Sequence, residues 1–461
     1  MTKQAAGHGL LFMVLFILPI GSLSYSGHHS HADHHRHKSS FRRVLIGHDS
    51  DKYAVIFDAG STGSRVHVFR FDQNQDLLPI GNELELYVST KPGLSSYAAD
   101  PQAAASSLRP LLEKAEAVVP IELQPDTPAR LGATAGLRLV QGDAAEKILD
   151  VVRNLFKNES NLKYKHDWVS ILDGVQEGTY MWATINYLLN TLGKNYAETV
   201  ATIDLGGASV QMAYAISDEN AAKAPQAATN ETYLLQKNLK GTNYNLYVHS
   251  YLKYGSKAAR AEIFKASRNS TNPCILDGYD GTYTYGGVVY KVSAPRTGTN
   301  MKRCQILTRK ALKINAPCKY DSCTFNGIWN GGGGDGEKNL YLSSSFYWTA
   351  LDSGILKQNA TAGRILVNAY KDTAKRACAT KFSNVISEFP NVQEDSRPYL
   401  CMDLVYIYTL LVDGFDLNAS QKVAVVKDVK YKNSHVEASW PLGCAIDVMS
   451  SLTTKTLIEN I

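Results

Sequence analysis

Two stretches of the chain share one hydrophobic pattern, in which an apolar run ends in Asp and a turn of small residues leads into a second apolar run. The first, from Ala54 to Phe71, reads A-V-I-F-D-A-G-S-T-G-S-R-V-H-V-F-R-F, and the second, from Thr202 to Met212, reads T-I-D-L-G-G-A-S-V-Q-M. Apolar runs bounded by such turns predict strands. The aspartates Asp58 and Asp204 are 204 − 58 = 146 residues apart, a repeat of domain size. We therefore expect two related lobes whose turns face each other across a cleft.

The hydrophobic periodicity of the rest of the chain predicts units of strand and helix. Helical periodicity is found in Pro101–Val119, and a strand that runs through a turn into a helix is expected in Pro128–Val140 and again in Val169–Tyr187. Later in the chain we expect strands and turns for Tyr279–Tyr290 and helices for Tyr341–Leu356 and Tyr399–Phe415.

Two Gly-containing segments of the second half are expected to interrupt regular structure. Gly331–Gly336 reads G-G-G-G-D-G, but no strand ending in Asp precedes it, so it predicts a flexible solvent loop. Trp440–Gly443 reads W-P-L-G and predicts a break before a final helix, Ala445–Thr453.

The N-terminal region differs in composition from the rest. Residues 1–24 have Lys3, a short apolar core from Leu10 to Ile20 and small residues at the end, which predicts a secretory signal peptide; an uncleaved signal anchor remains an alternative. Residues 25–43 contain six of the twelve His residues of the chain. They could bind a transition metal, but nothing fixes the imidazoles in a defined geometry, so we favour a solvated tail.

Composition and modification signals fit a globular protein of the secretory pathway. A chain of 461 residues with 44% hydrophobic and 20% charged residues is long and apolar enough to form two hydrophobic cores. Its net charge of +5 is too small to indicate nucleic-acid binding. Five N-x-[ST] sequons favour glycosylation. They lie at Asn158, Asn230, Asn269, Asn359 and Asn418. The seven Cys, none in a C-x-x-C pair, favour disulfides over a zinc site and leave one thiol over.

The first turn has the chemistry of a phosphate-binding loop with an acidic side chain for a metal ion. Gly60 and Gly63 can take positive φ, so that backbone N–H groups converge on one point. Hydroxyl groups come from Ser61, Thr62 and Ser64, a positive charge from Arg65, and a carboxylate from Asp58. No Lys follows the glycines, so the P-loop pattern is excluded.

Glu177 is the candidate general base. It follows Asp173-Gly174 in the first turn of the helix expected after Val169. A carboxylate there can simply interact favourably with the helix dipole. Alternatively, it can take a proton from a water molecule that attacks a bound phosphate. No G-x-S-x-G or catalytic Cys signature is present, and hydrolysis without a protein nucleophile needs such a base. Thr134, between Gly132 and Gly136, lies where the backbone could approach a ligand or simply pack tightly.

Five motifs in this order resemble the apyrase family, the nucleoside triphosphate diphosphohydrolases. They are D-A-G-S-T-G-S-R from Asp58, L-G-A-T-A-G-L-R from Leu131, D-G-V-Q-E-G-T-Y-M-W from Asp173, D-L-G-G-A-S-V-Q from Asp204 and Y-L-C-M-D-L-V-Y from Tyr399. The resemblance implies an α/β, two-lobed, actin-like ATPase fold made of duplicated ribonuclease H-like domains, with the active site in the interlobe cleft. It divides the chain into lobe I (44–173), lobe II (174–440) and a C-terminal segment (441–461) whose helix returns to lobe I.

The same resemblance implies an activity and roles for single residues. The expected reaction removes phosphate from nucleoside tri- and diphosphates such as ATP and ADP, with Ca²⁺ or Mg²⁺, and Glu177 is the expected base. The carboxylates of Asp58 and Asp204 are expected to hold the metal ion largely through water. Phosphate-binding positions are Gly60, Ser61, Thr62, Gly63, Ser64, Arg65, Thr134, Gly206, Gly207, Ala208, Ser209 and Gln211. The nucleobase is expected between Tyr347 and Arg397.

The resemblance also implies the disulfides, and two alternative functions remain open. The expected pairs are Cys274–Cys304, Cys318–Cys323 and Cys378–Cys401, with Cys444 free. A sugar kinase or chaperone ATPase of the same fold is one alternative, which Glu177 in its D-G-x-x-E-G context argues against. A carbohydrate-binding or signalling protein is the other, and a carbohydrate ligand is compatible with enzyme activity. We expect the protein to be secreted, or anchored in the Golgi or another membrane by at most one N-terminal span.

Overall fold

A computed structural model describes residues 51–60, 62–225, 232–267 and 270–459, with side chains through Ser451. The predicted signal peptide, the His-rich tail, Ser61 and the sequons at Asn230 and Asn269 lie outside the described residues. The unit described below is the one that runs from Asp49 to the C-terminus. Within the described residues, no helix combines the length and the apolar composition needed to cross a bilayer.

The first sheet is built on the hairpin of the first Asp-containing turn. Strand β1 pairs antiparallel with β2 and parallel with β5, β5 pairs parallel with β6, and β2 pairs antiparallel with β3 and β4. The strands are β1 (Lys52–Ala59), β2 (Ser64–Phe71), β3 (Leu77–Leu78), β4 (Glu85–Thr90), β5 (Ala129–Ala133) and β6 (Val169–Ile171). Three helices follow strands of this sheet, α1 (Pro101–Val118), α2 (Ala135–Arg138) and α3 (Ala144–Glu159).

The second sheet repeats the order of the first. Strand β7 pairs antiparallel with β8 and parallel with β13, β13 pairs parallel with β15, and β8 pairs antiparallel with β10. Its strands are β7 (Ala201–Leu205), β8 (Ser209–Ile216), β9 (Leu234–Leu239), β10 (Thr242–Leu252), β13 (Leu340–Ser344), β14 (Ala362–Leu366) and β15 (Lys422–Val426). The order β4-β2-β1-β5-β6 therefore corresponds to β10-β8-β7-β13-β15, and the two-lobed, duplicated α/β fold expected from the sequence is confirmed.

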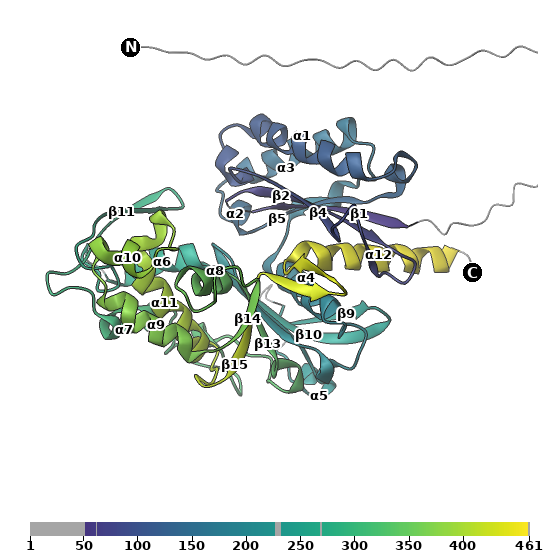
Figure 1. Cartoon of the computed structure of the whole chain (residues 1–461). Coiled ribbons are helices and arrows are strands. Elements are labelled where there is room, and N and C mark those ends of the chain that lie inside the picture. The colour runs from purple at the N-terminus through teal and green to yellow at the C-terminus, as the bar shows by residue number, and fades with distance from the viewer. Residues whose placement is uncertain (1–50, 61, 226–231, 268–269, 460–461) are drawn as a thin grey trace, which may run out of the picture. The chain divides into compact units, whose positions relative to one another are not determined.

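Two helices lie between the sheets, α4 (Gly174–Leu188) and α12 (Trp440–Glu459) (Figure 1). They pack against each other, and one continuous core contains residues of both helices, such as Trp182 and Ile446, with Ile56 of β1 and Val248 of β10. Successive side chains of a strand point to opposite faces, so the other face of each sheet packs into a separate core. On the first sheet that core is closed by α1 and α3. Helix α12 also contacts β1, so the end of the chain packs on its first strand.

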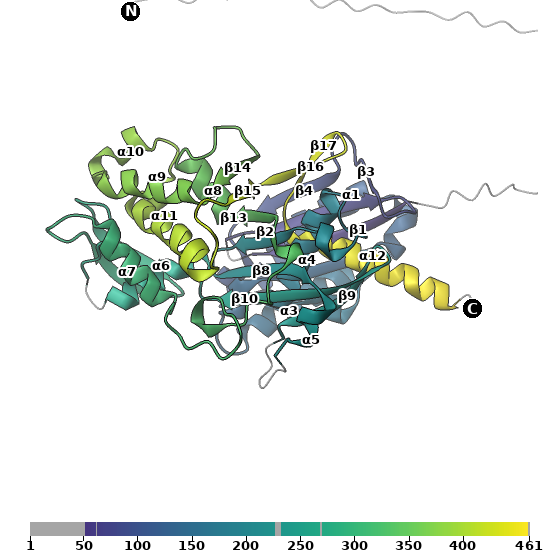
Figure 2. The same ribbon diagram turned by 90° about the horizontal axis from the view of Figure 1, so that it is seen from below.

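The remaining helices pack with the second sheet, and Figure 2 shows α6 to α11 together on one side of it, with α5 apart from them near β9. They are α5 (Asp218–Ala222), α6 (Ser256–Ser267), α7 (Met301–Ala311), α8 (Ser345–Asp352), α9 (Asn368–Ala379), α10 (Val385–Glu388) and α11 (Leu400–Thr409). Two hairpins complete the fold, β11 (Asp280–Tyr285) with β12 (Val288–Ser293), and β16 (Asp428–Tyr431) with β17 (Ser434–Glu437). The three expected disulfides, Cys274–Cys304, Cys318–Cys323 and Cys378–Cys401, are present and Cys444 is a buried thiol.

Three expectations about local structure are wrong. The first four residues of Tyr341–Leu356 belong to strand β13, which lies between β7 and β15, and the expected helix begins only at Ser345 as α8. The strand begins with the apolar run Leu-Tyr-Leu, without alternation, because neither of its faces is exposed. Gly331–Gly336 is not a solvent loop, because the Tyr214 hydroxyl accepts from the Gly333 N–H at 3.0 Å and a Cβ on Gly336 would meet the Ala215 carbonyl at 2.0 Å. The W-P-L-G segment begins α12 instead of preceding it, with Pro441 in the first turn, where a missing N–H costs nothing.

The close packing of α12 on α4 gives a stability prediction. A Cβ at Gly443 would lie 2.0 Å from the Tyr180 carbonyl oxygen, so Gly443→Ala must separate the two helices. We expect a loss of at least about 2 kcal/mol in the free energy of unfolding. Denaturant unfolding measures it, with Ser451→Ala on the exposed side of the same helix as the control. Equal unfolding midpoints for Gly443→Ala and the wild type would contradict this packing.

Candidate active site

The two Asp-containing turns line one cavity of about 260 Å³. Eleven of the residues predicted from the sequence line it: Asp58, Gly60, Thr62, Arg65, Thr134, Glu177, Asp204, Gly206, Gly207, Ala208 and Ser209. The structure therefore brings most of the predicted set together from both halves of the chain. Gly63, Ser64 and Gln211 are not part of this lining, but Gln211 bonds to Glu177 and Ser209, which are.

The first turn is closed by contacts within the hairpin of β1 and β2. The Gly60 N–H donates to the Gly63 carbonyl at 3.0 Å, and Arg65 Nη1 donates to Asp58 Oδ2 at 3.0 Å from the paired position on β2. The expectation that Gly60 and Gly63 take positive φ is wrong. Glycine is needed for space instead, because a Cβ on Gly60 would meet Arg65 Nη1 at 2.8 Å and one on Gly63 would meet the carbonyl oxygen of Thr90 at 2.7 Å.

The second turn is held by the start of α6. The Gly206 carbonyl accepts from the Ser256 N–H at 2.8 Å, and the Gly207 carbonyl accepts from the Lys257 N–H at 2.9 Å. These bonds turn the carbonyls toward α6 and leave the N–H groups of the turn for an anion in the cavity. Gly255 allows this approach, since a Cβ there would lie 2.4 Å from the Ala208 nitrogen.

Glu177 is positioned by the approach of α4 to the second sheet. Asp173 caps the helix by accepting from the Gln176 N–H at 2.8 Å. The glycines on either side of Glu177 lie against the sheet, because a Cβ on Gly174 would meet Ser250 Oγ at 2.0 Å and one on Gly178 would meet Val248 at 2.9 Å. The D-G-x-x-E-G motif thus brings the Glu177 carboxylate to the cavity between the two turns.

Two side chains fix the Glu177 carboxylate. Arg138 Nη2 donates to its Oε2 in a short contact, and Gln211 Nε2 donates to the same oxygen at 3.4 Å. Gln211 Nε2 also donates to Ser209 Oγ at 2.7 Å, whereas its Oε1 is buried without a partner. An unpartnered amide oxygen beside a carboxylate is an acceptor for a bound water molecule.

Three of the carboxylates that line the cavity, those of Glu177, Asp204 and Asp58, lie near one another, and the pKa values of Glu177 and Asp204 are shifted. Burial raises the pKa of Glu177 to about 7; the positive charge of Arg138 opposes this shift, and the charges of Asp204 and Asp58 add to it. Burial also raises the pKa of Asp204, although hydrogen bonds from Ser344 and Ser343 lower it. A carboxylate with a pKa near 7 is suited to take a proton at neutral pH.

The donor set fits a hard divalent cation. Asp58 Oδ1 is buried without a hydrogen-bond partner, and the carboxylates of Asp58 and Asp204 lie in the same cavity as Glu177. Within the described residues, Asp58 and Asp204 do not belong to a group of three closely spaced ligand atoms. A cation between them would keep much of its water shell, as Mg²⁺ does, and would satisfy the unpaired oxygen.

The two residues expected to bind the nucleobase lie away from the cavity. Tyr347 is only 4% exposed, and its hydroxyl donates to the Ala360 carbonyl at 2.9 Å within the core. Arg397 donates from Nε to the Val392 carbonyl at 3.2 Å and is not part of the lining. Ser61, the remaining predicted phosphate ligand, lies outside the described residues.

Sequence reasoning missed Trp348, Arg138 and Ser344. Trp348 is 50% exposed and lines both the 260 Å³ cavity and an adjoining cavity of about 410 Å³. Consecutive helix residues point about 100° apart, so the buried Tyr347 leaves its neighbour facing the cavity. Arg138 was inside a recognised motif and could have been found as the charge partner of Glu177. Ser344 lies at the end of β13, where its φ of 59° shows a strained backbone that has no sequence signal.

Comparisons with known proteins find similarity over most of the chain. Residues 44–460 match the GDA1/CD39 (nucleoside phosphatase) family. A protein named apyrase from Solanum tuberosum is 61% identical over 91% of this chain and 92% of its own length. A nucleoside-triphosphatase from Pisum sativum is 49% identical over 96% of both chains, and ectonucleoside triphosphate diphosphohydrolase 5 from Gallus gallus is 32% identical over 87% of this chain and 88% of its own.

A solved structure has the same fold. The nucleoside triphosphate hydrolase structure from Neospora caninum superposes with a TM-score of 0.61 at 12% identity, covering 87% of this chain and 93% of that one. At this identity the likeness concerns the fold alone.

The raised pKa of Glu177 gives a prediction about stability and pH. The folded-state value of about 7 lies above the ordinary value of 4.5, so the folded protein binds the proton more tightly. The stability that this proton contributes is present below about pH 4.5 and is lost, by roughly 3 kcal/mol, as the pH rises through 7. We expect metal-free Glu177→Gln to lose less stability over this range than the wild type does. Denaturant unfolding at several pH values with chelator tests this, with the exposed Glu159→Gln as the control; parallel curves for Glu177→Gln and the wild type would contradict it.

Proposed function

Because the chain belongs to the GDA1/CD39 (nucleoside phosphatase) family, we propose that this enzyme hydrolyses nucleoside tri- and diphosphates, including ATP and ADP, by direct attack of water with Glu177 as the base. The observation that carries the proposal is the position of the Glu177 carboxylate, which lines the same cavity as both phosphate-type turns. The products are inorganic phosphate and, after both steps, the nucleoside monophosphate.

The residues of the cavity divide the work of the reaction. Gln211 Oε1 holds the attacking water, whose proton passes to Glu177 as its oxygen bonds to the terminal phosphorus. The bond from that phosphorus to the bridging oxygen breaks, and the shortened nucleotide leaves with the electron pair. N–H groups of the Gly206–Ser209 turn and hydroxyl groups of the first turn accommodate the charge on the phosphate oxygens. Arg138 keeps the carboxylate of Glu177 oriented without itself reaching the substrate.

A divalent cation, Ca²⁺ or Mg²⁺, would be held by Asp58 and Asp204, largely through water. The cation supplies positive charge to the phosphate oxygens and so reduces repulsion between the substrate and the three carboxylates. Hydrogen bonds from Ser343 at 2.9 Å and from Ser344 fix the Asp204 carboxylate for this role.

The nucleobase is accommodated in the cavity of about 410 Å³ that adjoins the phosphate site. Trp348 belongs to both linings, and its half-exposed indole ring offers a stacking face where the phosphate site ends. Leu400 and Ile407 supply further apolar surface, and Asp352 and Ser396 supply polar groups. We propose Trp348 in place of Tyr347 as the stacking residue.

The cysteine pattern supports folding in the secretory pathway. Three disulfides form within lobe II, and disulfides are formed and kept in oxidising compartments. Together with the sequons and the signal-like N-terminus, this supports a role in controlling nucleotides outside the cell or within the secretory pathway.

The first experiment tests the base and the metal. We expect phosphate release from both ATP and ADP in the presence of Ca²⁺ or Mg²⁺, and none above background with chelator. Glu177→Gln keeps the shape of the side chain but removes the base, so release should fall by at least about 10². Glu159→Gln, an exposed carboxylate on α3, is the control. Normal turnover by Glu177→Gln would show that another group takes the proton.

The second experiment tests the base pocket. Trp348→Ala removes a stacking face worth about 1–3 kcal/mol, so KM for ATP should rise about tenfold or more with kcat changed less. KM for inorganic tripolyphosphate, which has no base, should stay the same. Tyr347→Phe, which removes only the buried hydroxyl of the neighbouring residue, is the control. An unchanged KM for ATP in Trp348→Ala would exclude this position for the base.

A further inference from the structure

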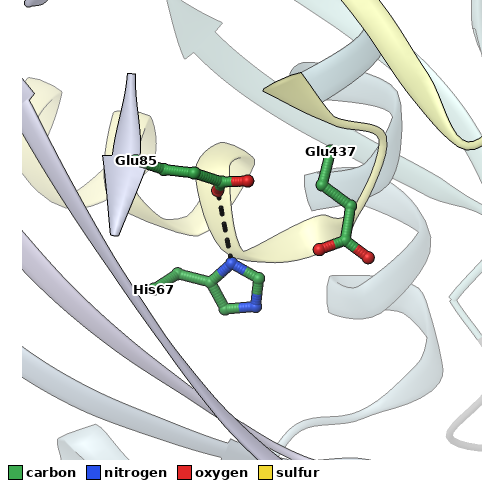
Figure 3. A group of neighbouring side chains, drawn as sticks. All are labelled: His67, Glu85 and Glu437. Atoms are coloured by element: carbon green, nitrogen blue, oxygen red, sulfur yellow. Dashed lines mark hydrogen bonds and ion pairs between the residues drawn. The ribbon is translucent and has the colours of Figure 1, made fainter. Parts of the chain in front are cut away.

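A second cluster of ligand-type side chains lies beside the active-site cavity. It contains His67 of β2, Glu85 of β4 and Glu437 of β17, and one ligand atom from each lies within 4.8 Å of the others (Figure 3). His67 and Glu437 also line the cavity, which gives an ion a path to the cluster. The pairing of β2 with β4 places His67 opposite Tyr87, two residues from Glu85 and on the same face.

The contacts inside the cluster leave the imidazole incompletely satisfied. His67 is 1% exposed, its Nδ1 lies 3.4 Å from Glu85 Oε2, and its Nε2 has no hydrogen-bond partner. In Figure 3 the Glu85 carboxylate approaches the ring from its Nδ1 side and Glu437 lies on another side. The contact of 3.4 Å is long for a hydrogen bond, so the Nδ1 side of the ring, which faces Glu85, is where a ligand can be gained.

A simple ion pair accounts for these contacts less well than a metal ion does. Burial lowers the pKa of His67, but the hydrogen bond and the charge of Glu85 outweigh this and leave the pKa raised, so a protonated ring would face Glu85. A charge-assisted hydrogen bond between such a ring and a carboxylate is normally about 2.7–2.9 Å long, shorter than the 3.4 Å found here. Two ligands each about 2.0–2.1 Å from one tetrahedral zinc ion lie roughly 3.4 Å apart, which matches the separation between Nδ1 and Oε2, so a zinc ion bound through Nδ1 replaces this long contact with two ligand bonds.

The charge of the cluster also favours a divalent cation. With neutral imidazole the two carboxylates carry two negative charges, and burial, together with the charge of Glu85, raises the pKa of Glu437. Arg65 faces Glu437 as well, but its Nη1 donates to Asp58. One imidazole and two carboxylates are a ligand set that zinc accepts, with a fourth position left for water.

We propose that His67, Glu85 and Glu437 bind a zinc ion at a site separate from the catalytic cation, which would be held by oxygen ligands alone. The ion would tie strand β17, which leads directly into α12, to strands β2 and β4 of the first sheet. The ion therefore connects the first sheet to the segment before α12 through metal–ligand bonds that do not involve the substrate.

The test is zinc binding by the full chain in excess Mg²⁺, which occupies the oxygen-only site. The six histidines of the tail are first replaced by Asn to remove adventitious binding: His28, His29, His31, His34, His35 and His37. Equilibrium dialysis should then find one tightly held zinc ion per chain. Glu85→Gln, Glu437→Gln and His67→Gln should each weaken its binding at least about tenfold. The control is His435→Asn, an exposed histidine on the same strand as Glu437.

X-ray absorption at the zinc edge provides a readout that does not depend on substitution. The bound ion should show the outer-shell scattering of one imidazole, which the aspartates of the catalytic cation cannot produce. Unchanged zinc binding in both Glu85→Gln and Glu437→Gln, or a spectrum without an imidazole ligand, would overturn the proposal. Because the two Glu variants leave the buried ring in place, the proposal remains testable if His67→Gln does not fold.

Discussion

The active site depends on how closely helix α4 approaches the second sheet. Gly174 and Gly178 lie where a Cβ would collide with Ser250 and Val248, so the helix backbone lies against β10. On its other side α4 packs against α12, where Gly443 again allows backbone contact. A helix confined on both sides has little freedom to shift, and the carboxylate at its first turn is fixed with it. This confinement is the precondition for catalysis by positioning, in which small displacements of a reacting group are costly.

Confinement also produces the electrostatics of the cavity. The carboxylates of β1, α4 and β7 lie in one cavity, which Glu437 also lines, and Arg138 is the positive charge in direct contact with Glu177. In the absence of a cation such a site is destabilising, since buried like charges raise the proton affinity of one another. The same repulsion favours the binding of a divalent cation, and it favours the transfer of a proton from water to Glu177. The strain that reduces stability is thus part of what makes the site reactive.

The recurrence of the Asp turn predicted the duplicated fold, because hydrophobic runs ending in Asp-x-Gly are local features of the sequence. The residues of both turns and Glu177 were found for the same reason. The sequence could not show that Gly60 and Gly63 are needed for space, because their neighbours Arg65 and Thr90 are brought close by strand pairing. Whether Tyr347 or Trp348 faces the cavity likewise depends on which face of α8 is buried. Both side chains are aromatic, so residue type alone could not decide between them. The His67 cluster combines β2 and β4 with β17, which lies far from both of them along the chain.

Helix α12 has a consequence for the order in which the molecule is made. It is the last element of the chain, yet it packs on β1, the first, and on α4, and it completes the core between the sheets. Contacts of such high sequence separation form late, because a long loop must close before they are gained. Each lobe can collapse on its outer core as soon as its own elements have been synthesised, but the inner core must wait until α12 has been synthesised as well. A chain that ended before Trp440 would have both phosphate-type turns and lack the helix that holds α4 in place, so truncated products should be inactive and exposed to quality control.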